Sequence, residues 1–239
     1  GTMAVVSAAS YIGPDAARDS IVSAFGEKLA TEAKAATGTI PPTTLAGTTV
    51  RVRDITGIER LAPLFYVSPT QVNFQIPPGT SIGDAVITIT SGDGNGSLQA
   101  VAIASVSPAL FSADATGSGF AAAHVQRIQN GQTLAYEQVT KFDTQQGKIV
   151  AVPIEFKDGQ DLHLGLYGSG LRYRTSVNNV KVRIGTLELP VQYAGTQNTF
   201  VGLDQVNVLL SPNLKGAGEV NVTVIVDGKA TNTLKLLFQ

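Results

Sequence analysis

Hydrophobic and polar residues alternate along most of this chain with a period of two, the spacing that places successive side chains on opposite faces of a β-sheet. Clusters of Gly, Pro, Asn, Asp and Ser lie between the alternating segments and are typical of turns. Short strands separated by turns every ~8–12 residues indicate an antiparallel β-sandwich. The alternating segments include TTVRVR, TQVNFQI, DAVITIT, LQAVAIA, NNVKVRI, DQVNVLL and EVNVTVIV.

The chain also repeats itself at long range. Residues 66–94 align without a gap on residues 200–228, and eight of the 29 positions are identical. The match centres on the triplet Gln-Val-Asn, which stands at 71–73 and again at 205–207. The alignment pairs Tyr66 with Phe200, Val67 with Val201, Gln71 with Gln205, Val72 with Val206, Asn73 with Asn207, Pro78 with Pro212, Val86 with Val220, Asp93 with Asp227 and Gly94 with Gly228.

Segments upstream of each triplet match in the same order. DSIVSAFGEKL at 19–29 corresponds to DLHLGLYGSGL at 161–171, and VRVR at 50–53 corresponds to VKVR at 180–183. A pattern repeated in order over such a length indicates a duplicated structural unit.

The duplication predicts an all-β protein of two tandem immunoglobulin-like β-sandwich domains, at 1–112 and 113–239. Each domain would hold about seven strands in ~100 residues or slightly more, the size of an immunoglobulin-like domain. The boundary is expected in SPALFSADATGSG, near residues 107–119, because Pro, Ser and Gly interrupt the strand pattern there.

One segment fits two interpretations. Residues 14–38 are rich in Ala and carry three large apolar side chains four residues apart, which by itself indicates an amphipathic helix. The matching segment of the second half alternates as a strand, so we expect a strand at 19–25. A short helix or an insertion loop is expected at 27–37, and the strands within 120–160 are not assigned.

The repeated triplet has an apolar centre and two amide ends. In a strand, its Val would face the core and its Gln and Asn would share the opposite face. One interpretation is structural, with the amides bonding the backbone of a neighbouring loop. The other is a polar ladder that binds sugar hydroxyls. The residues concerned are Val72 and Val206 on the core side, and Gln71, Asn73, Gln205 and Asn207 on the other.

Composition narrows the possible partners. Charged residues make up 15% of the chain and the net charge is −1, so no field attracts a nucleic acid. The chain has no cysteine, which excludes disulfides and cysteine-bound zinc. No stretch approaches the ~18 consecutive apolar residues of a membrane span, so membrane insertion is not expected.

Templates for catalysis and metal binding are not matched. The two histidines, His124 and His163, have no metal-site spacing and are interpreted as ordinary strand residues. The glycines of TGSGF at 116–120 and YGSGL at 167–171 are wrongly placed for a nucleophile elbow. Phosphate-binding loop motifs are missing. We therefore identify no catalytic, metal-binding or cofactor-binding residue, and a hydrolase built from scattered acids is the least favoured alternative.

GDGNGS at 92–97 has oxygen-bearing side chains at alternating positions, as calcium loops do. An EF-hand loop that begins at Asp93 would need Gly and Glu where the chain has Leu98 and Ala104. A hairpin turn is favoured, because the second half has a turn at the matching place. Binding of a single calcium ion by backbone carbonyls of this loop remains an alternative.

The whole chain resembles known families. An aromatic-Gly pair, a V-x-V strand, TQVNFQIPPGT or DQVNVLLSPN, and a V-x-V-T strand are similar to the IPT/TIG class of immunoglobulin-like domains. The chain more closely resembles a family of secreted proteins common in acidobacteria, except at 27–37 and 120–160. The segments of this chain on which the resemblance rests are VVSAASY, SIVSAFGEKLA, LFYVSPTQVNFQIPPGT, VSPALFS, LYGSGLR and FVGLDQVNVLLSP. The resemblance implies an extracellular or cell-surface location, at the C-terminal end of a longer protein, and brings no known activity.

These observations favour a non-enzymatic structural or adhesion module, with a cell-surface protein or a polysaccharide as its partner. The alternative is a carbohydrate-binding module, for which exposed aromatic platforms are the usual signal. Tyr136, Tyr173 and Tyr193 are the candidates for such a face, although a core position is favoured for each. The sequence identifies neither the ligand nor the oligomeric state.

Overall fold

The computed structural model describes residues 1–239 and is all-β. Its only helices are two short 3₁₀ turns, η1 (Val177–Asn179) and η2 (Pro212–Leu214). The chain divides into two compact units. Unit 1 consists of Gly1–Ser107 and residues 198–203, and unit 2 consists of Pro108–Gln197 and Asp204–Gln239.

Unit 1 contains a five-stranded and a six-stranded sheet. The first has the order β1 (Met3–Ser7), β3 (Ile21–Gly26), β9 (Gln71–Gln75), β8 (Leu64–Val67) and β4 (Lys34–Ala35). The second has the order β2 (Ala16–Ala17), β11 (Gly96–Ala104), β10 (Gly83–Thr90), β6 (Thr48–Arg53) and β5 (Thr44–Leu45), with β7 (Glu59–Leu61) also paired to β6.

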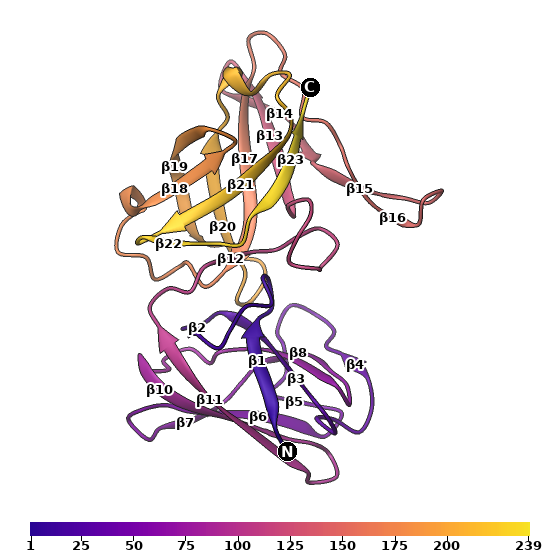
Figure 1. The fold of residues 1–239 in the computed structure, drawn as a ribbon, viewed down its shortest axis with the longest axis vertical. Coiled ribbons are helices and arrows are strands. Elements are labelled where there is room, and N and C mark those ends of the chain that lie inside the picture. Colours follow the sequence, from indigo (N-terminus) through magenta and orange to yellow (C-terminus); the bar gives the residue numbers. More distant parts are fainter. The chain divides into compact units, whose positions relative to one another are not determined.

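Both sheets of unit 1 bury their alternate residues in one core. Phe74 of β9 and Ile87 of β10 belong to the same cluster of buried side chains, and both are 0% exposed. Figure 1 shows the layers, with β6, β7, β10 and β11 in one and β1, β3 and β8 in the other. The alternation in the sequence therefore gives each sheet one apolar face, and the two apolar faces cover each other.

The segment with two interpretations forms a strand. Ile21–Gly26 is β3, and it lies between β1 and β9 in the sheet. No helix forms at 27–37, which contains the two-residue strand β4. The helical spacing was misleading. Strand β3 is hydrogen-bonded to a strand on each side, and this pairing outweighs the helix propensity of Ala.

Unit 2 contains a ten-stranded sheet and a separate hairpin. The sheet runs β14 (Gln132–Gln138), β13 (Ala123–Gln129), β17 (Asp161–Ser169), β20 (Asp204–Leu209), β19 (Leu187–Thr196), β18 (Val180–Ile184), β21 (Gly218–Val226) and β22 (Lys229–Ala230). Off this path, β12 (Ala109–Leu110) pairs with β17 and β23 (Leu234–Phe238) pairs with β21. The pairing of β12 places residues 109–110 with unit 2, upstream of the expected boundary at 112/113.

The large sheet changes direction at β19. The first part of β19 pairs with β18, and the second part pairs with β20. Figure 1 shows β18 and β21 drawn across β17 and β20. Leu164 and Val206 on one side of this change, and Val182 and Val224 on the other, are all 0% exposed. The sheet therefore folds over and covers its own apolar face.

A hairpin of β15 (Thr140–Asp143) and β16 (Lys148–Ala151) forms a sheet of its own. In Figure 1 it extends away from the rest of unit 2. Next to it in the chain, β14 is fixed to β13 by Arg127, which is 4% exposed and bonds Glu137 at 2.8 Å. This ion pair holds the pKa of Glu137 below its ordinary value.

The two Gln-Val-Asn triplets occupy equivalent places, as the repeat predicts. Val72 lies opposite Ala24 of β3, and Val206 lies opposite Leu166 of β17. Both valines are 0% exposed. The amide residues lie on the opposite face and are half-buried. Their partners differ from the expected loop backbone, because in each unit the Gln side chain donates to the Asn side chain two residues on, at 2.9 Å in unit 1 and 2.7 Å in unit 2.

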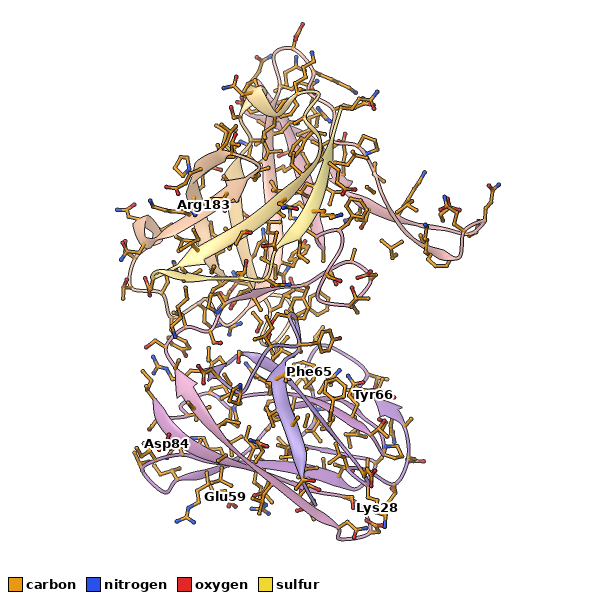
Figure 2. The ribbon with its side chains drawn as sticks, in the orientation of Figure 1. Lys28, Glu59, Phe65, Tyr66, Asp84 and Arg183 are labelled. Atoms are coloured by element: carbon orange, nitrogen blue, oxygen red, sulfur yellow. The ribbon has the colours of Figure 1, made fainter.

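The predicted pairing of Tyr66 with Phe200 is wrong. Tyr66 lies opposite Asn73, and the residue opposite Asn207 is Tyr193. The register shifts just before each tyrosine, at Phe65 in unit 1, which Figure 2 labels beside Tyr66, and at Gln192 in unit 2. The gapless alignment failed here because the loop before the second triplet is longer than the loop before the first.

The predicted pairing of Val86 with Val220 also fails. Ile87 lies opposite Val52 and Val224 lies opposite Val182, so Ile87 and Val224 are the equivalent residues. The reason is the connection that precedes each strand. Ile87 comes about 14 residues after Asn73, whereas Val224 comes about 17 residues after Asn207, in a connection that includes η2. The extra residues of the second connection shift the alignment by an odd number and invert the faces of the strand.

Candidate functional site

A polar pocket lies on the face of the large sheet in unit 2 that points away from the core. Its volume is about 230 Å³. Strands β13, β14, β17, β19 and β20 all contribute to it, and every side chain that lines it is polar or, at one position, glycine. The lining residues are His124, Gln126, Tyr136, His163, Gly165, Gln192, Gln205 and Asn207.

Strand register brings these residues together. Gly165 of β17 lies opposite His124 of β13 on one side and opposite Asn207 of β20 on the other. Gln126 lies opposite His163 of β17, two residues before the glycine. Because side chains alternate across a strand, residues at these even spacings share one face. The same alternation that buries the valines and leucines therefore assembles a continuous polar surface.

His124 lies across Gly165. A Cβ atom at Gly165 would come within 2.3 Å of His124 Cε1, closer than any real contact. The imidazole is held between two aromatic rings, with centroid distances of 5.8 Å to Tyr136 and 5.5 Å to Tyr167. Glycine in a strand interior often marks such a close approach. Here it leaves room for the imidazole and sets the depth of the pocket.

Gln192 reaches the pocket from the bulge in β19. A bulge places an additional residue in one strand and re-aims its side chain. Gln192 Oε1 lies 2.8 Å from His163 Nδ1. This contact fixes the His163 ring and leaves its Nε2 atom directed to other partners. The bulge therefore adds a residue that strict alternation would have excluded from this face.

The pocket offers both donors and acceptors of hydrogen bonds. Gln205 Nε2 donates to Asn207 Oδ1, so Gln205 Oε1 and Asn207 Nδ2 keep their capacity for another partner. Gln126 Nε2 donates to Thr133 Oγ1 at 2.7 Å, and its Oε1 stays available. His124 Nδ1 is buried and has no hydrogen-bond partner within the protein, and because it is closed to solvent it is not among the groups offered to a ligand.

The pocket is electrically neutral. None of its lining residues is Asp, Glu, Lys or Arg. Burial lowers the pKa of His124 from its ordinary value, so its imidazole is uncharged at neutral pH. These groups can bind and orient a hydroxyl-rich ligand. They include no nucleophile with an adjacent base and no carboxylate pair for glycoside hydrolysis.

Unit 1 closes the equivalent surface. Ser23 takes the place of Gly165, opposite the first triplet's Asn73, and its hydroxyl donates to Asn73 Oδ1 at 2.8 Å. Val6 takes the place of His124, opposite Ser23. A serine hydroxyl and a valine side chain thus stand where unit 2 has a glycine and an imidazole.

The structure brings some of the candidate residues named from the sequence into the pocket and leaves the others outside it. His124 and His163 do lie in strands, and the structure brings both to one pocket together with Tyr136, Gln205 and Asn207. Tyr173 and Tyr193 are 36% exposed and do not line it. Tyr193 instead donates to the carbonyl of Thr196 at 2.5 Å. Gln71 and Asn73 lie in unit 1. Sequence reasoning missed Gln126, Gly165 and Gln192.

A second hollow, of about 530 Å³, lies over β10 and β11 in unit 1. Its floor is made of small apolar side chains, among them Val86, Ala100 and Ala102. Arg53 also lines it, together with Asp84, which Figure 2 labels. Asp15 and Asp54 line it as well, so this hollow mixes charged and apolar groups, unlike the neutral pocket of unit 2.

The predicted hairpin turn after β10 is confirmed, because Thr90 lies opposite Gly96. Asp93 closes this turn by accepting hydrogen bonds from Ser91 and Asn95. No group of three or more His, Asp or Glu side chains in the structure is arranged to hold a metal ion. The structure also has no helix with the length and apolar character needed to cross a membrane.

No family model matches the chain, and no curated protein matches it. Solved structures with some likeness include SGBP-B of the Bacteroides ovatus mixed-linkage glucan utilization locus, in complex with a mixed-linkage heptasaccharide (13% identity, TM-score 0.30). The match covers 94% of this chain, which spans only 43% of that protein.

Two further structures are similar at the same level. Bovine butyrophilin has 8% identity and a TM-score of 0.28, with 99% of each chain covered. A tetra-tandem repeat from the extending region of a large adhesion protein has 10% identity and a TM-score of 0.23, with 100% of this chain and 74% of that chain covered. TM-scores this low carry no argument about function.

Proposed function

We propose that this chain is a non-enzymatic structural or adhesion module that consists of two immunoglobulin-like β-sandwich domains. One observation carries the proposal. Both units repeat the same strand pairings around Gln-Val-Asn, the same Gln-to-Asn hydrogen bond and a bulge at the same place. A rigid sandwich used twice in series is a natural spacer or adhesive unit, because each copy has its own core.

The setting we propose is extracellular, as part of a larger secreted protein. The support is the resemblance of the sequence to the secreted acidobacterial family and to IPT/TIG domains. A cell-surface protein or a polysaccharide would be the partner, and the module would need no cofactor.

Single-molecule pulling of the full chain tests the architecture. Two independent sandwiches should unfold in two events, each releasing roughly 35–45 nm at ~3.6 Å per residue. One event that releases the whole chain would contradict two domains. Adhesion is tested with beads coated with the chain and brought to bacterial cells or to purified cell-wall polysaccharide. Hydrolysis of such a polysaccharide, abolished by a single acid substitution, would overturn the non-enzymatic assignment.

The polar pocket favours a second candidate function, carbohydrate recognition by unit 2. Both copies of the triplet present a Gln and an Asn, but only the second copy lines a pocket with two histidines and an aromatic ring. Sugar hydroxyls are bound by neutral planar side chains that offer hydrogen-bond donors and acceptors. An aromatic ring nearby can cover the apolar face of the sugar.

The duplication supplies a matched control for this candidate. Gln205→Ala and Gln71→Ala remove the same side chain from equivalent places in the two units. On a glycan array, Gln205→Ala should lose the binding of the wild-type chain, and Gln71→Ala should keep it. Equal loss in both variants, or no glycan bound by the wild-type chain, would remove carbohydrate recognition from consideration.

A further inference from the structure

We infer that the polar pocket takes a single uncharged sugar ring, and that Gly165 is the residue that makes unit 2 the binding unit. The inference rests on the second candidate function and specifies its ligand. Four properties of the pocket lead to it: the size, the lack of charge, the hydrogen-bonding groups and the glycine itself.

Size limits the ligand to one ring. Sites for drug-sized ligands measure ~300–1,000 Å³, whereas this pocket measures about 230 Å³. A second ring would lie outside the lining residues. The ring that binds would therefore be the end of a glycan chain or a side branch.

The lack of charge selects a neutral ring. A uronic acid or a phosphorylated sugar would bring a carboxylate or phosphate into a site whose lining has no Arg or Lys, and removing an unpaired charge from water is costly. A cationic amino sugar would find no carboxylate. A neutral hexose or an N-acetylated hexosamine has only groups that this lining can satisfy.

The hydrogen-bonding groups suit hydroxyls. Each sugar hydroxyl both donates and accepts, and the pocket holds acceptor and donor side by side in Gln205 Oε1 and Asn207 Nδ2. Gln126 Oε1 is a third group, because Gln126 donates to Thr133 through Nε2 and keeps its carbonyl oxygen as an acceptor. Tyr136 is 66% exposed at the rim and can cover the apolar face of a ring.

Gly165 makes room for the imidazole of His124 in the pocket wall. The imidazole of His124 occupies the volume that any Cβ at position 165 would take, with Cε1 2.3 Å from that point. Unit 1 has Ser23 at the equivalent position, and the Ser23 hydroxyl already occupies Asn73 Oδ1. Two differences, Ser23 for Gly165 and Val6 for His124, therefore distinguish the two surfaces, although the triplet is the same in both units.

The test is a titration of the ¹⁵N-labelled full chain, followed by NMR. The probes are the methyl glycosides of glucose, galactose, mannose and N-acetylglucosamine, together with glucuronic acid as the charged comparison. We expect a neutral sugar to shift the side-chain amide signals of Gln205 and Asn207, while glucuronic acid at equal concentration leaves them unchanged. Tighter binding of glucuronic acid would overturn the inference.

Variants test the residues. Gly165→Ala should weaken binding of the neutral sugar at least tenfold, and Ser23→Ala in unit 1 should leave it unchanged. Because Gly165→Ala forces His124 to move and could disturb folding, Tyr136→Ala serves as a second variant. Its ring is at the rim, so the sheet should stay intact and binding should again fall about tenfold. Unchanged binding in folded Gly165→Ala or in Tyr136→Ala contradicts the inference.

The outcomes also separate this inference from the function on which it rests. If a sugar binds but shifts signals outside the pocket, carbohydrate recognition survives and the inference fails. If no sugar shifts any signal and no glycan is bound on the array, both fail together.

Discussion

Ser23 donates a hydrogen bond of 2.8 Å to Asn73 across strands β3 and β9. Asn207 has the same register position in unit 2, but it faces Gly165, which has no side chain to donate. The same triplet therefore plays different parts in the two units. In unit 1 the Asn Oδ1 accepts hydrogen bonds from both Gln71 and Ser23, and in unit 2 the Asn Oδ1 accepts one from Gln205 alone.

This difference predicts unequal costs for the same substitution. In Asn73→Ala, the hydroxyl of Ser23, which is 1% exposed, loses its partner, so the free energy of unfolding of unit 1 should fall by about 1–3 kcal/mol. In Asn207→Ala, the half-buried Gln205 amide can turn to water, and unit 2 should lose no more than about 1 kcal/mol.

Denaturant titrations with amide hydrogen exchange in β9 and β20 measure both changes. The double variant Ser23→Ala/Asn73→Ala is the control, because removing both partners leaves no unpaired group and should recover part of the loss. An equal loss in Asn73→Ala and Asn207→Ala would show that Ser23 does not stabilise unit 1 through this bond.

The sequence was sufficient to predict the alternating strands around the triplets and the equivalence of the triplets, but not the strands within 120–160. Val72 and Val206 are buried, and their amide neighbours lie on the other face, because both follow from a period of two. The alignment around them failed where loops differ. A longer loop before the second triplet and a longer connection after it change the register, and neither leaves a signal in an ungapped comparison.

The pocket was beyond prediction from the sequence. His124 and His163 meet because β13 pairs with β17, and that pairing depends on the hairpins between them, which carry no repeat signal. Gln192 arrives through a bulge. Gly165 was the one visible signal, because a glycine within an alternating strand indicates a close approach by a neighbour. Finding that neighbour required the coordinates.

Asp204 should be among the most costly polar residues to remove. Its side chain is 0% exposed, and it accepts hydrogen bonds from Leu171 N at 2.9 Å and from Arg172 Nε at 2.7 Å. Asp204→Ala removes the carboxylate partner from both donors, so unit 2 should lose about 3–5 kcal/mol of unfolding free energy. The exposed pair of Glu219 and Lys235 is the control, and Glu219→Ala should cost at most about 1 kcal/mol. Similar losses in chemical denaturation would contradict this ranking.

The hairpin of β15 and β16 should be the first place that a protease cuts. Two-stranded hairpins are marginally stable alone in water, and Phe142 of this one is 60% exposed. Limited trypsin digestion should cleave at Lys141 or Lys148 before other sites. Because Thr140 lies opposite Ala151, residues 141–150 can be replaced by two glycines, and the thermal midpoint should not change measurably. A first cut within β13 or β17 would contradict the prediction.

Acid should destabilise unit 2 through His124. Burial lowers the pKa of this imidazole below 6.5, so the unfolded chain takes up a proton more readily than the folded one. Its contribution to stability is therefore complete above pH ~6.5 and is lost as the pH falls through the lower pKa of the folded state. Of the groups around His124, the Tyr167 ring has a pKa raised by burial and keeps its proton in this range, and Tyr136 and His163 are the other neighbours in the pocket.

The pH dependence of unfolding isolates this contribution. Glu137 also has a lowered pKa, but its loss begins only near its ordinary value of 4.5, below the window from pH 7 to pH 5. Burial raises the pKa of Asp204, which changes stability in the opposite direction, so the difference between the wild-type chain and His124→Gln isolates His124. Between these values the denaturation midpoint of unit 2 should fall in the wild-type chain and fall less in His124→Gln. His163→Gln controls for the second imidazole and should keep the part due to His124. A His124→Gln variant with the full wild-type slope would show that the buried imidazole does not control acid stability.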